Sequence, residues 1–394
     1  MIILDSVQEV ARKAETSEIL FLIAAFAGSF IICLVLIPLI IKLSMQYNLV
    51  DKPNERKVHK VPISRLGGLG IVAGTLSTFP LWFIYTDNYL VFHLLAGIFI
   101  LMIVGIIDDL RELPPKVKFL CQVVAALFLA HAGLLIENMF GIFGVTVLPV
   151  FLQYLITVFI VAGIINAFNL IDGIDGLAGG LAFIDVTGFF IIFYLSGELG
   201  VAFITASVGG ALLAFLKYNW HPAKIFMGDT GSMFLGYLLA AAGIITLVSS
   251  QGQASHFTYS EAAVIVYSIF LLPVYDTLRV FVVRVKNEKS PFSPDKTHIH
   301  HILMQTGFNH PKSAKILYVA NISIIATGFL MKASHLSLVI PLLFLEVVFF
   351  SEFLTLYKLV QSWLKRRKLK NKMLRMHADN RLLIDNMKDK DGKN

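Results

Sequence analysis

An asparagine and two aspartates lie three residues apart, at Asn169, Asp172 and Asp175, between two long apolar runs. Glycines at 173 and 176 let the backbone turn tightly there and approach another group closely. Carboxylate and amide oxygens are the ligands that hard divalent cations take. Asp175 alone could be the N-cap of the following helix, but capping does not account for Asn169 and Asp172. We interpret the stretch as one wall of a site for a phosphate-bearing, metal-bound substrate.

A pair of adjacent aspartates, Asp108 and Asp109, ends an earlier apolar run. Neighbouring carboxylates repel each other unless a cation or a hydrogen-bond donor lies between them, and acids at the C-terminus of a helix oppose its dipole. One interpretation is a helix that simply ends in solvated acids. The other, which we favour, is a catalytic pair that binds a hard divalent ion or takes a proton from a nucleophile.

A further acid, Asp229, precedes another apolar run within Gly228–Ser232. Asp, Thr and Ser are ordinary N-caps, so capping alone is one explanation. Free backbone N–H groups at a helix start, beside a carboxylate, are also what a magnesium-bound diphosphate would meet. We therefore keep Asp229 as a candidate metal ligand.

Three histidines fall within four residues, at His298, His300 and His301. Zinc is one interpretation, but no cysteine is nearby and the other acids prefer magnesium. We favour imidazoles that donate hydrogen bonds to phosphate oxygens. Lys60 and Arg65, in an earlier loop, are expected to add cationic contacts to the same anion.

The composition indicates which elements must position these residues. The chain has 394 residues, of which 57% are hydrophobic and 15% charged, whereas soluble domains carry about 25% charged residues. Repeated apolar runs of about 20 residues favour membrane-spanning helices. We predict an all-α polytopic membrane protein with about eleven spans, at 19–42, 66–86, 89–107, 116–135, 150–168, 177–196, 199–217, 231–249, 260–283, 313–332 and 335–359.

The charged loops predict the orientation of these spans. The net charge of +7 is concentrated in a few loops and in the tail, which fits the positive-inside rule and is not a nucleic-acid signal. The rule places segment 1–18 outside and the basic tail 360–394 in the cytoplasm, where the tail meets anionic lipid. The catalytic domain is then 19–359, and its cytoplasmic loops hold all four acidic or histidine motifs; these loops are 43–65, 108–115, 169–176, 218–230 and 284–312.

Two acids fall inside predicted spans. We expect Asp276, near a cytoplasmic end, to pair with Arg279 one turn later. For Asp185, well inside its span, a functional role and an interhelical hydrogen bond remain equal alternatives.

The motifs together resemble the polyprenyl-phosphate N-acetylhexosamine-1-phosphate transferases. His-Ile-His-His is similar to the branch that uses UDP-N-acetylglucosamine, whereas the phospho-MurNAc-pentapeptide branch usually has three histidines in a row. The likeness covers most of the chain, through Val50-Asp-Lys-Pro-Asn54, Arg65-Leu-Gly-Gly68, Asp108-Asp109, Asn166 to Gly176, Phe226 to Gly231 and Ser293 to His301.

This resemblance implies transfer of N-acetylglucosamine 1-phosphate from UDP-GlcNAc to undecaprenyl phosphate, with release of UMP and with Mg²⁺ or Mn²⁺ as cofactor. It implies a bacterial inner membrane protein whose active site faces the cytoplasm. It also implies roles for individual residues: Asp229 as magnesium ligand, Asp108 as the group that deprotonates or positions the lipid phosphate, Asn169, Asp172 and Asp175 along the nucleotide-sugar site, and the three histidines on the diphosphate or sugar.

Two departures from the family pattern and several alternatives remain. Glu112 stands where the pentapeptide branch has a lysine, and Ser64 stands where many members have proline. Another UDP-N-acetyl sugar, an aspartyl intermediate in place of direct attack, and a homodimer all stay open. A transporter is the main rival class, although transporters place their sites near the middle of the bilayer.

Overall fold

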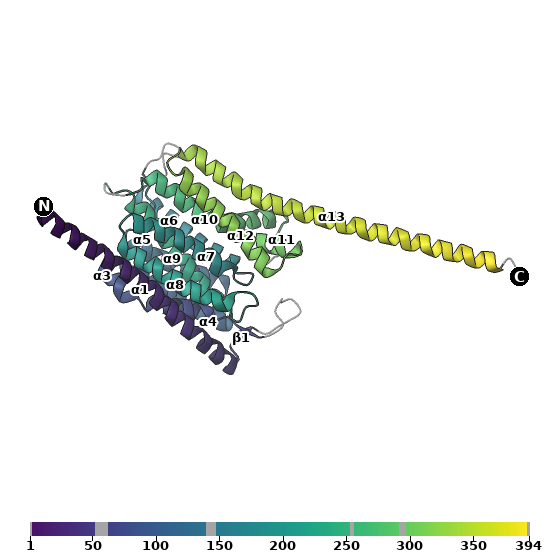
Figure 1. The fold of residues 1–394 in the computed structure, drawn as a ribbon, viewed down its shortest axis with the longest axis horizontal. Helices are drawn as coiled ribbons and strands as arrows, with labels where there is room; N and C mark the ends of the chain where they lie inside the picture. Colours follow the sequence, from purple (N-terminus) through teal and green to yellow (C-terminus); the bar gives the residue numbers. More distant parts are fainter. Residues whose placement is uncertain (1, 52–61, 139–146, 253–255, 291–296, 392–394) are drawn as a thin grey trace.

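Helices make up nearly all the regular structure, because long apolar runs in lipid satisfy their backbone only by forming helices or closed barrels. The computed structural model describes residues 2–51, 62–138, 147–252, 256–290 and 297–391, arranged as a bundle of helices (Figure 1). The helices are α1 (Ile2–Gln46), α2 (Gly67–Leu76), α3 (Phe79–Tyr85), α4 (Asn88–Arg111), α5 (Pro115–His131), α6 (Val150–Ile171), α7 (Leu177–Leu195), α8 (Leu199–Asn219), α9 (Gly228–Ser249), α10 (Tyr259–Lys286), α11 (Ile299–Gln305), α12 (His310–Met331) and α13 (Leu336–Asp391).

Nine helices within the described ranges are long and apolar enough to cross a membrane. The prediction of an all-α polytopic membrane protein is therefore confirmed. The span predicted at 66–86 is instead two helices, α2 and α3, bent by 42° at their junction. Helix α5 has 17 residues, a length of about 26 Å that falls short of a hydrocarbon core of about 30 Å. The count of eleven spans and the orientation of the termini stay predictions.

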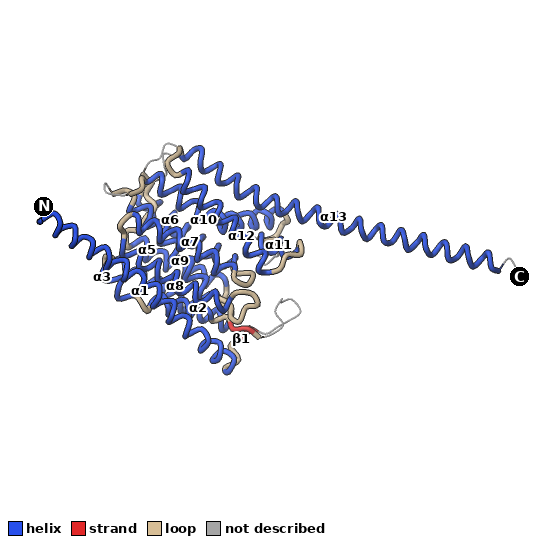
Figure 2. Tube along the Cα trace, in the orientation of Figure 1, coloured by secondary structure: helices blue, strands red, loops and turns tan. Residues whose placement is uncertain are grey.

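Helices α8 and α9 form the centre of the bundle (Figure 2). In the most apolar window of each helix, 83% of α8 and 89% of α9 is buried inside the protein, compared with 22% of α1. Exposed aromatic side chains such as Phe151 and Phe159 on α6 face outward, where lipid is an apolar solvent for them. The outer helices therefore shield a core from which α9 reaches one end of the bundle.

Helix α4 packs closely on the start of α9. A Cβ atom on Gly105 would lie 2.4 Å from the Cα of Thr230, so only a glycine permits this approach. The contact brings the C-terminal end of α4, which carries Asp108 and Asp109, beside the N-terminal end of α9.

A short hairpin closes the same end of the bundle. Strand β1 (Val50–Asp51) pairs antiparallel with β2 (Ile63–Ser64), and Asp51 lies opposite Ile63. The Ser64 carbonyl accepts a hydrogen bond from the N–H of Phe226 (2.8 Å), and Gly68 N–H donates to the Met227 carbonyl (2.8 Å). These bonds tie the segment before α2 to the segment before α9.

The two acids predicted inside spans both have polar partners in the structure. Asn321 of α12 donates to Asp185 Oδ1 of α7 (2.7 Å), which confirms the interhelical hydrogen bond. Arg279 Nη2 lies 3.2 Å from Asp276 Oδ1, which confirms the predicted pair. Both aspartates hold helices or loops together.

The two ends of the chain extend beyond the bundle. Helix α1 begins at Ile2 and so includes most of the predicted segment 1–18, while α13 continues as one helix through the predicted tail as far as Asp391. In Figure 1 the C-terminal half of α13 projects far from the other helices. The basic residues predicted for the tail thus lie on a projecting helix.

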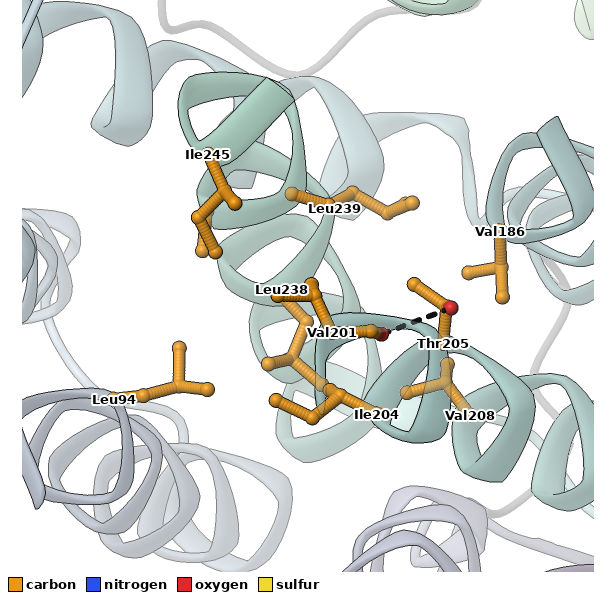
Figure 3. A pocket seen from close by; sticks show the side chains of 11 residues that line it. Leu94, Val186, Val201, Ile204, Thr205, Val208, Leu238, Leu239 and Ile245 are labelled. Carbon is orange, nitrogen blue, oxygen red and sulfur yellow. Dashed lines mark hydrogen bonds between the residues drawn. The ribbon is translucent and has the colours of Figure 1, made fainter. Parts of the chain in front are cut away.

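A small apolar cavity of about 20 Å³ lies in the core (Figure 3). Its one polar lining residue, Thr205, donates a hydrogen bond to the Val201 carbonyl (3.0 Å). None of the acids discussed above lines it, so it belongs to the packing of the bundle and not to a substrate site. The lining is Leu94, Val186, Val201, Ile204, Thr205, Val208, Leu238, Leu239, Ala241, Ala242 and Ile245.

Candidate active site

The ends of three helices bring predicted site residues around one lysine. Lys118 Nζ, from the first turn of α5, lies 3.2 Å from Asp108 Oδ2 and 2.9 Å from Asp229 Oδ2. Asn169, near the end of α6, donates to Asp229 Oδ1 (3.0 Å) and to Ser232 Oγ (3.0 Å). Asp108, Asp229 and Asn169 therefore form one cluster, as their chemistry predicted.

The sequence analysis did not identify Lys118. Two lysines, Lys116 and Lys118, follow Pro115 at the start of a span, and the positive-inside rule accounts for both without any site. In the structure Lys116 is exposed while Lys118 is partly buried against the carboxylates. The only signal available was a cation at the end of a span that neighbours acidic motifs.

Asp109 binds the start of α9. Its Oδ1 accepts a hydrogen bond from Asp229 N–H (2.7 Å), and its Oδ2 accepts from the N–H (3.1 Å) and the hydroxyl (2.6 Å) of Thr230. Gly228, with φ +69°, passes so close that a Cβ would lie 2.5 Å from Asp109 Oδ1. A carboxylate at this position complements the dipole of α9. Asp109 thus contacts the backbone of Asp229 and Thr230. The catalytic role predicted for Asp109 stays a prediction.

Asp172 is the least compensated acid of the cluster. It lies just after α6, partly buried, and accepts no hydrogen bond from the residues that the structure describes. Burial, followed by the negative charges of Asp229, Asp109 and Asp175, raises the pKa of Asp172 to about 7. A carboxylate held among like charges is suited to receive a cation.

Asp175 interacts with two histidines. Its Oδ2 accepts from His221 Nδ1 (2.6 Å) and from Ala223 N–H (3.2 Å), and its Oδ1 lies 3.4 Å from His310 Nδ1. Burial alone would raise the pKa of Asp175, but contact with His310 and His221 outweighs burial and lowers it. The N-cap of α7 is Gly176 and not Asp175, so the capping interpretation is wrong.

The histidine motif packs against the Asp172 loop. His298 is buried and its Nδ1 lies 2.9 Å from Asp276 Oδ2, whose other oxygen accepts from Ile299 N–H (3.0 Å) at the start of α11. His300 approaches Gly173 so closely that a Cβ there would lie 2.1 Å from its Nε2. Its ring centroid is 4.3 Å from that of His301.

His300 is a neutral imidazole. Burial and the neighbouring His301 lower the pKa of His300 to about 3, and neither ring nitrogen has a hydrogen-bond partner among the described residues. Within those residues, the three predicted histidines are not part of a group whose ligand atoms are close enough to share a metal ion. The choice between hydrogen bonding to phosphate and zinc binding stays a prediction for this motif.

Arg65 and Lys60 are the two cations predicted to contact the substrate anion. Arg65 pairs with Asp51 of β1 (2.6 Å) and lies 3.7 Å from Glu112 at the end of α4. Its carbonyl borders Gly228, so it flanks the cluster without contacting Asp229. Lys60 lies outside the described residues.

The cluster fits a divalent cation with oxygen ligands. Four carboxylates gather there, from Asp108, Asp109, Asp172 and Asp229, while Lys118 contacts two of them, Asp108 and Asp229. Asp172 has no hydrogen-bond donor among the described residues. Mg²⁺ and Mn²⁺ take carboxylate oxygens as ligands. The residues present therefore fit the metal that the sequence predicted.

Comparison with known proteins agrees with this arrangement. The profile of glycosyl transferase family 4 matches residues 91–247, which include the ends of α4, α6 and α9. A Bacillus subtilis protein named "Probable undecaprenyl-phosphate N-acetylglucosaminyl 1-phosphate transferase" is 34% identical over 83% of this chain and 90% of its own length. The undecaprenyl-phosphate alpha-N-acetylglucosaminyl 1-phosphate transferase of Escherichia coli K12 is 32% identical over 75% of this chain and 79% of its own.

A third relative carries the same chemistry with a different lipid in its name. The decaprenyl-phosphate N-acetylglucosaminephosphotransferase of Mycolicibacterium smegmatis is 34% identical over 73% of this chain and 76% of its own length. Identity at this level extends over 73–83% of this chain in the three relatives. The chain therefore belongs to the family of polyprenyl-phosphate N-acetylhexosamine-1-phosphate transferases.

Proposed function

We propose that this protein transfers N-acetylglucosamine 1-phosphate from UDP-GlcNAc to undecaprenyl phosphate, giving undecaprenyl-diphosphate-GlcNAc and UMP. The observation that carries the proposal is the meeting of Asp108 and Asp229 at Lys118, with Asn169 bound to Asp229. The names of the related proteins support the choice of donor and acceptor. The product would serve as the first membrane intermediate of a cell-surface polysaccharide.

The position of the cluster suits an acceptor that is anchored in a membrane. Asp108 lies at the C-terminal end of α4 and Asp229 at the N-terminal end of α9, so in the proposed arrangement both would stand where a span meets water. An acceptor phosphate at the headgroup level and a soluble nucleotide-sugar would meet there. A transporter would place these acids near the middle of the bilayer, which the helix ends do not favour.

The proposed orientation puts this end of the bundle in the cytoplasm of a bacterium. With eleven crossings the basic loops would lie on the same side as the acidic motifs, and cytoplasmic loops carry an excess of Lys and Arg. With α5 and the bent α2–α3 pair counted as crossings, the chain would cross eleven times, with its N-terminus outside and its C-terminus inside.

The proposed reaction is one in-line displacement. An oxygen of the lipid phosphate attacks the phosphorus atom that bears the sugar, and the bond from that phosphorus to the bridging oxygen breaks, so UMP leaves with that oxygen. Asp108 is placed to orient the lipid phosphate and to accept its proton. Lys118 holds Asp108 and Asp229 at a fixed separation. Such a transfer requires mainly positioning and neutralisation of charge.

Asp229 would hold Mg²⁺ or Mn²⁺, with Asp172 as a second oxygen donor. Bound there, the metal would neutralise the charge of the donor diphosphate and the charge that develops on the UMP phosphate as it leaves. Asn169 keeps Asp229 oriented through its amide (3.0 Å). Asp109 keeps the α9 backbone in place behind it.

The donor would lie along the loop that follows α6. Asp172 and Asp175 border this loop, and His300 lies against its Gly173. A neutral His300 donates one hydrogen bond to a diphosphate or sugar oxygen and brings no added charge. His298 acts through Asp276, which fixes its ring.

The test is release of UMP by the purified protein. Labelled UDP-GlcNAc, undecaprenyl phosphate and Mg²⁺ are supplied together, and UMP and the lipid product are measured. We expect equal amounts of both, and less product from a panel of other UDP-sugars. Absence of UMP with both substrates and Mg²⁺ present would overturn the proposal.

A further inference from the structure

Three side chains outside the Lys118 cluster converge on one point. Asp175 precedes α7, His221 follows α8, and His310 is the first residue of α12. One ligand atom from each lies within 4.8 Å of the other two. Among the described residues this is the one group of His, Cys, Asp or Glu that meets this condition.

The contacts of His310 within this group are incomplete as hydrogen bonds. His310 Nδ1 lies 3.2 Å from the N–H of Asp175 and 3.4 Å from Asp175 Oδ1. One ring nitrogen cannot accept from the N–H and donate to the carboxylate at once. In addition, the buried Nε2 of His310 has no hydrogen-bond partner among the described residues.

The ligand atoms are close enough to surround one metal ion. Zinc–nitrogen bonds of about 2.0 Å in a tetrahedron place neighbouring ligand atoms about 3.3 Å apart. The separation of His310 Nδ1 from Asp175 Oδ1, 3.4 Å, is close to this value, whereas His221 Nδ1 lies 2.6 Å from Asp175 Oδ2, at the distance of a hydrogen bond that a bound ion would replace. Two imidazoles and one carboxylate form a donor set that zinc takes, with a fourth position left for water.

The group differs in character from the carboxylate cluster. Imidazole nitrogens suit zinc, whereas sets of oxygens alone suit magnesium. His221 is exposed, with 39% of its side chain accessible, so an ion can reach the site from water. The rings of His221 and His310 lie with centroids 5.0 Å apart, near enough to share one ion and distinct from the Asp229 centre.

We propose that Asp175, His221 and His310 form a second metal site, selective for Zn²⁺ over Mg²⁺. An ion held there ties together the segments before α7, after α8 and at the start of α12. The site thus fixes the loop that carries Asp172, independently of whether the transferase proposal holds.

The test measures metal binding by the full-length, untagged protein in detergent. Zn²⁺ is titrated against a chromophoric chelator, and Co²⁺ is used as a visible probe of four-coordinate geometry. We expect one equivalent of Zn²⁺ that millimolar Mg²⁺ does not displace. We expect at least tenfold weaker binding, and loss of the Co²⁺ absorption, in His221→Ala and in His310→Ala.

Control variants separate this site from the others. His93→Ala alters a histidine that packs on Tyr89 and His131, and Asp229→Asn alters the magnesium centre; both should keep the Zn²⁺ equivalent. Zn²⁺ should raise the Tm of the wild type and not that of His221→Ala. Three results would overturn the site: no saturable binding of Zn²⁺ to the wild type, wild-type Zn²⁺ affinity in both histidine variants, or loss of the bound Zn²⁺ in Asp229→Asn.

Discussion

At the scale of single residues, the site depends on charges that lie far apart in the sequence. Lys118 reaches Asp229, 111 residues away, and Asp175 meets His310, 135 residues away. The sequence predicted that Asp108, Asn169 and Asp229 lie close together, because all three fall at the ends of predicted spans on the same side of the membrane. It could not predict Lys118 or the histidine partners of Asp175, because no local pattern distinguishes them from ordinary loop residues.

Lys118 should be required for turnover. Lys118→Ala leaves Asp108 and Asp229 without their shared cation, and loss of one preorganised charge at such a site typically costs about 100-fold or more in kcat. UMP release measures the effect. Lys116→Ala, two residues away and exposed, is the matched control and should stay within about twofold. An equal loss in both variants would contradict the assignment, and Lys118→Arg should restore part of the activity.

Asp172 should make stability depend on pH when Mg²⁺ is absent. Its pKa in the folded protein is about 7, against a model value of 3.8. The folded state therefore binds the Asp172 proton more tightly than the unfolded state does. The protein loses stability as pH rises from about 4, and the full destabilisation by ionised Asp172 is present above about pH 7. Asp172→Asn should raise Tm by about 2–3 °C more at pH 8 than at pH 5.

Asp175 provides the opposite control. Its pKa is lowered by His310 and His221 against the effect of burial, so its ionised form stabilises the fold at neutral pH and that stability is lost as pH falls. Asp175→Asn should lower Tm at pH 8. Thermal unfolding in detergent with a chelator measures both variants, and shifts of the same sign would contradict these charge assignments.

At the scale of helices and strands, the active site depends on how closely α4 approaches α9. The sequence predicted where most spans lie, because apolar runs of the right length are visible without a structure. It missed the bend between α2 and α3 because the length and hydropathy of the run predict a single span. Pro80, in the first turn of α3, was the available signal, since proline favours the start of a helix. It also could not tell that Gly105, among many glycines, is one that lies against Thr230.

Gly105→Ala should separate α4 from α9. The added Cβ would lie 2.4 Å from the Thr230 Cα, and overpacking of this kind costs about 1–3 kcal/mol. We expect a lower Tm and reduced UMP release, since Asp108 moves away from Asp229. Gly163→Ala in α6, where nothing lies within 4 Å, is the control and should be neutral or slightly stabilising. Equal behaviour of the two variants would argue against this contact.

At the scale of the whole molecule, the bundle is built around α8 and α9, with α1 and α13 at its outer faces (Figure 1). This order could not be predicted from the sequence, because side chains that face lipid and side chains that face other helices are both apolar. The convergence of the acidic motifs on one end was predictable, because the charged loops alternate along the chain. The arrangement places every carboxylate of the cluster at the end of a helix.

The most direct test of the account is a Mg²⁺ titration of UMP release by the wild type and by Asp229→Asn. If Asp229 is the metal ligand at the centre of the cluster, the variant will need at least tenfold more Mg²⁺ for half-maximal rate or will show no turnover. Asp108→Asn, measured alongside, should lose turnover while it keeps the Mg²⁺ dependence of whatever rate remains. An Asp229→Asn protein with wild-type rate and wild-type Mg²⁺ dependence would contradict the central claim.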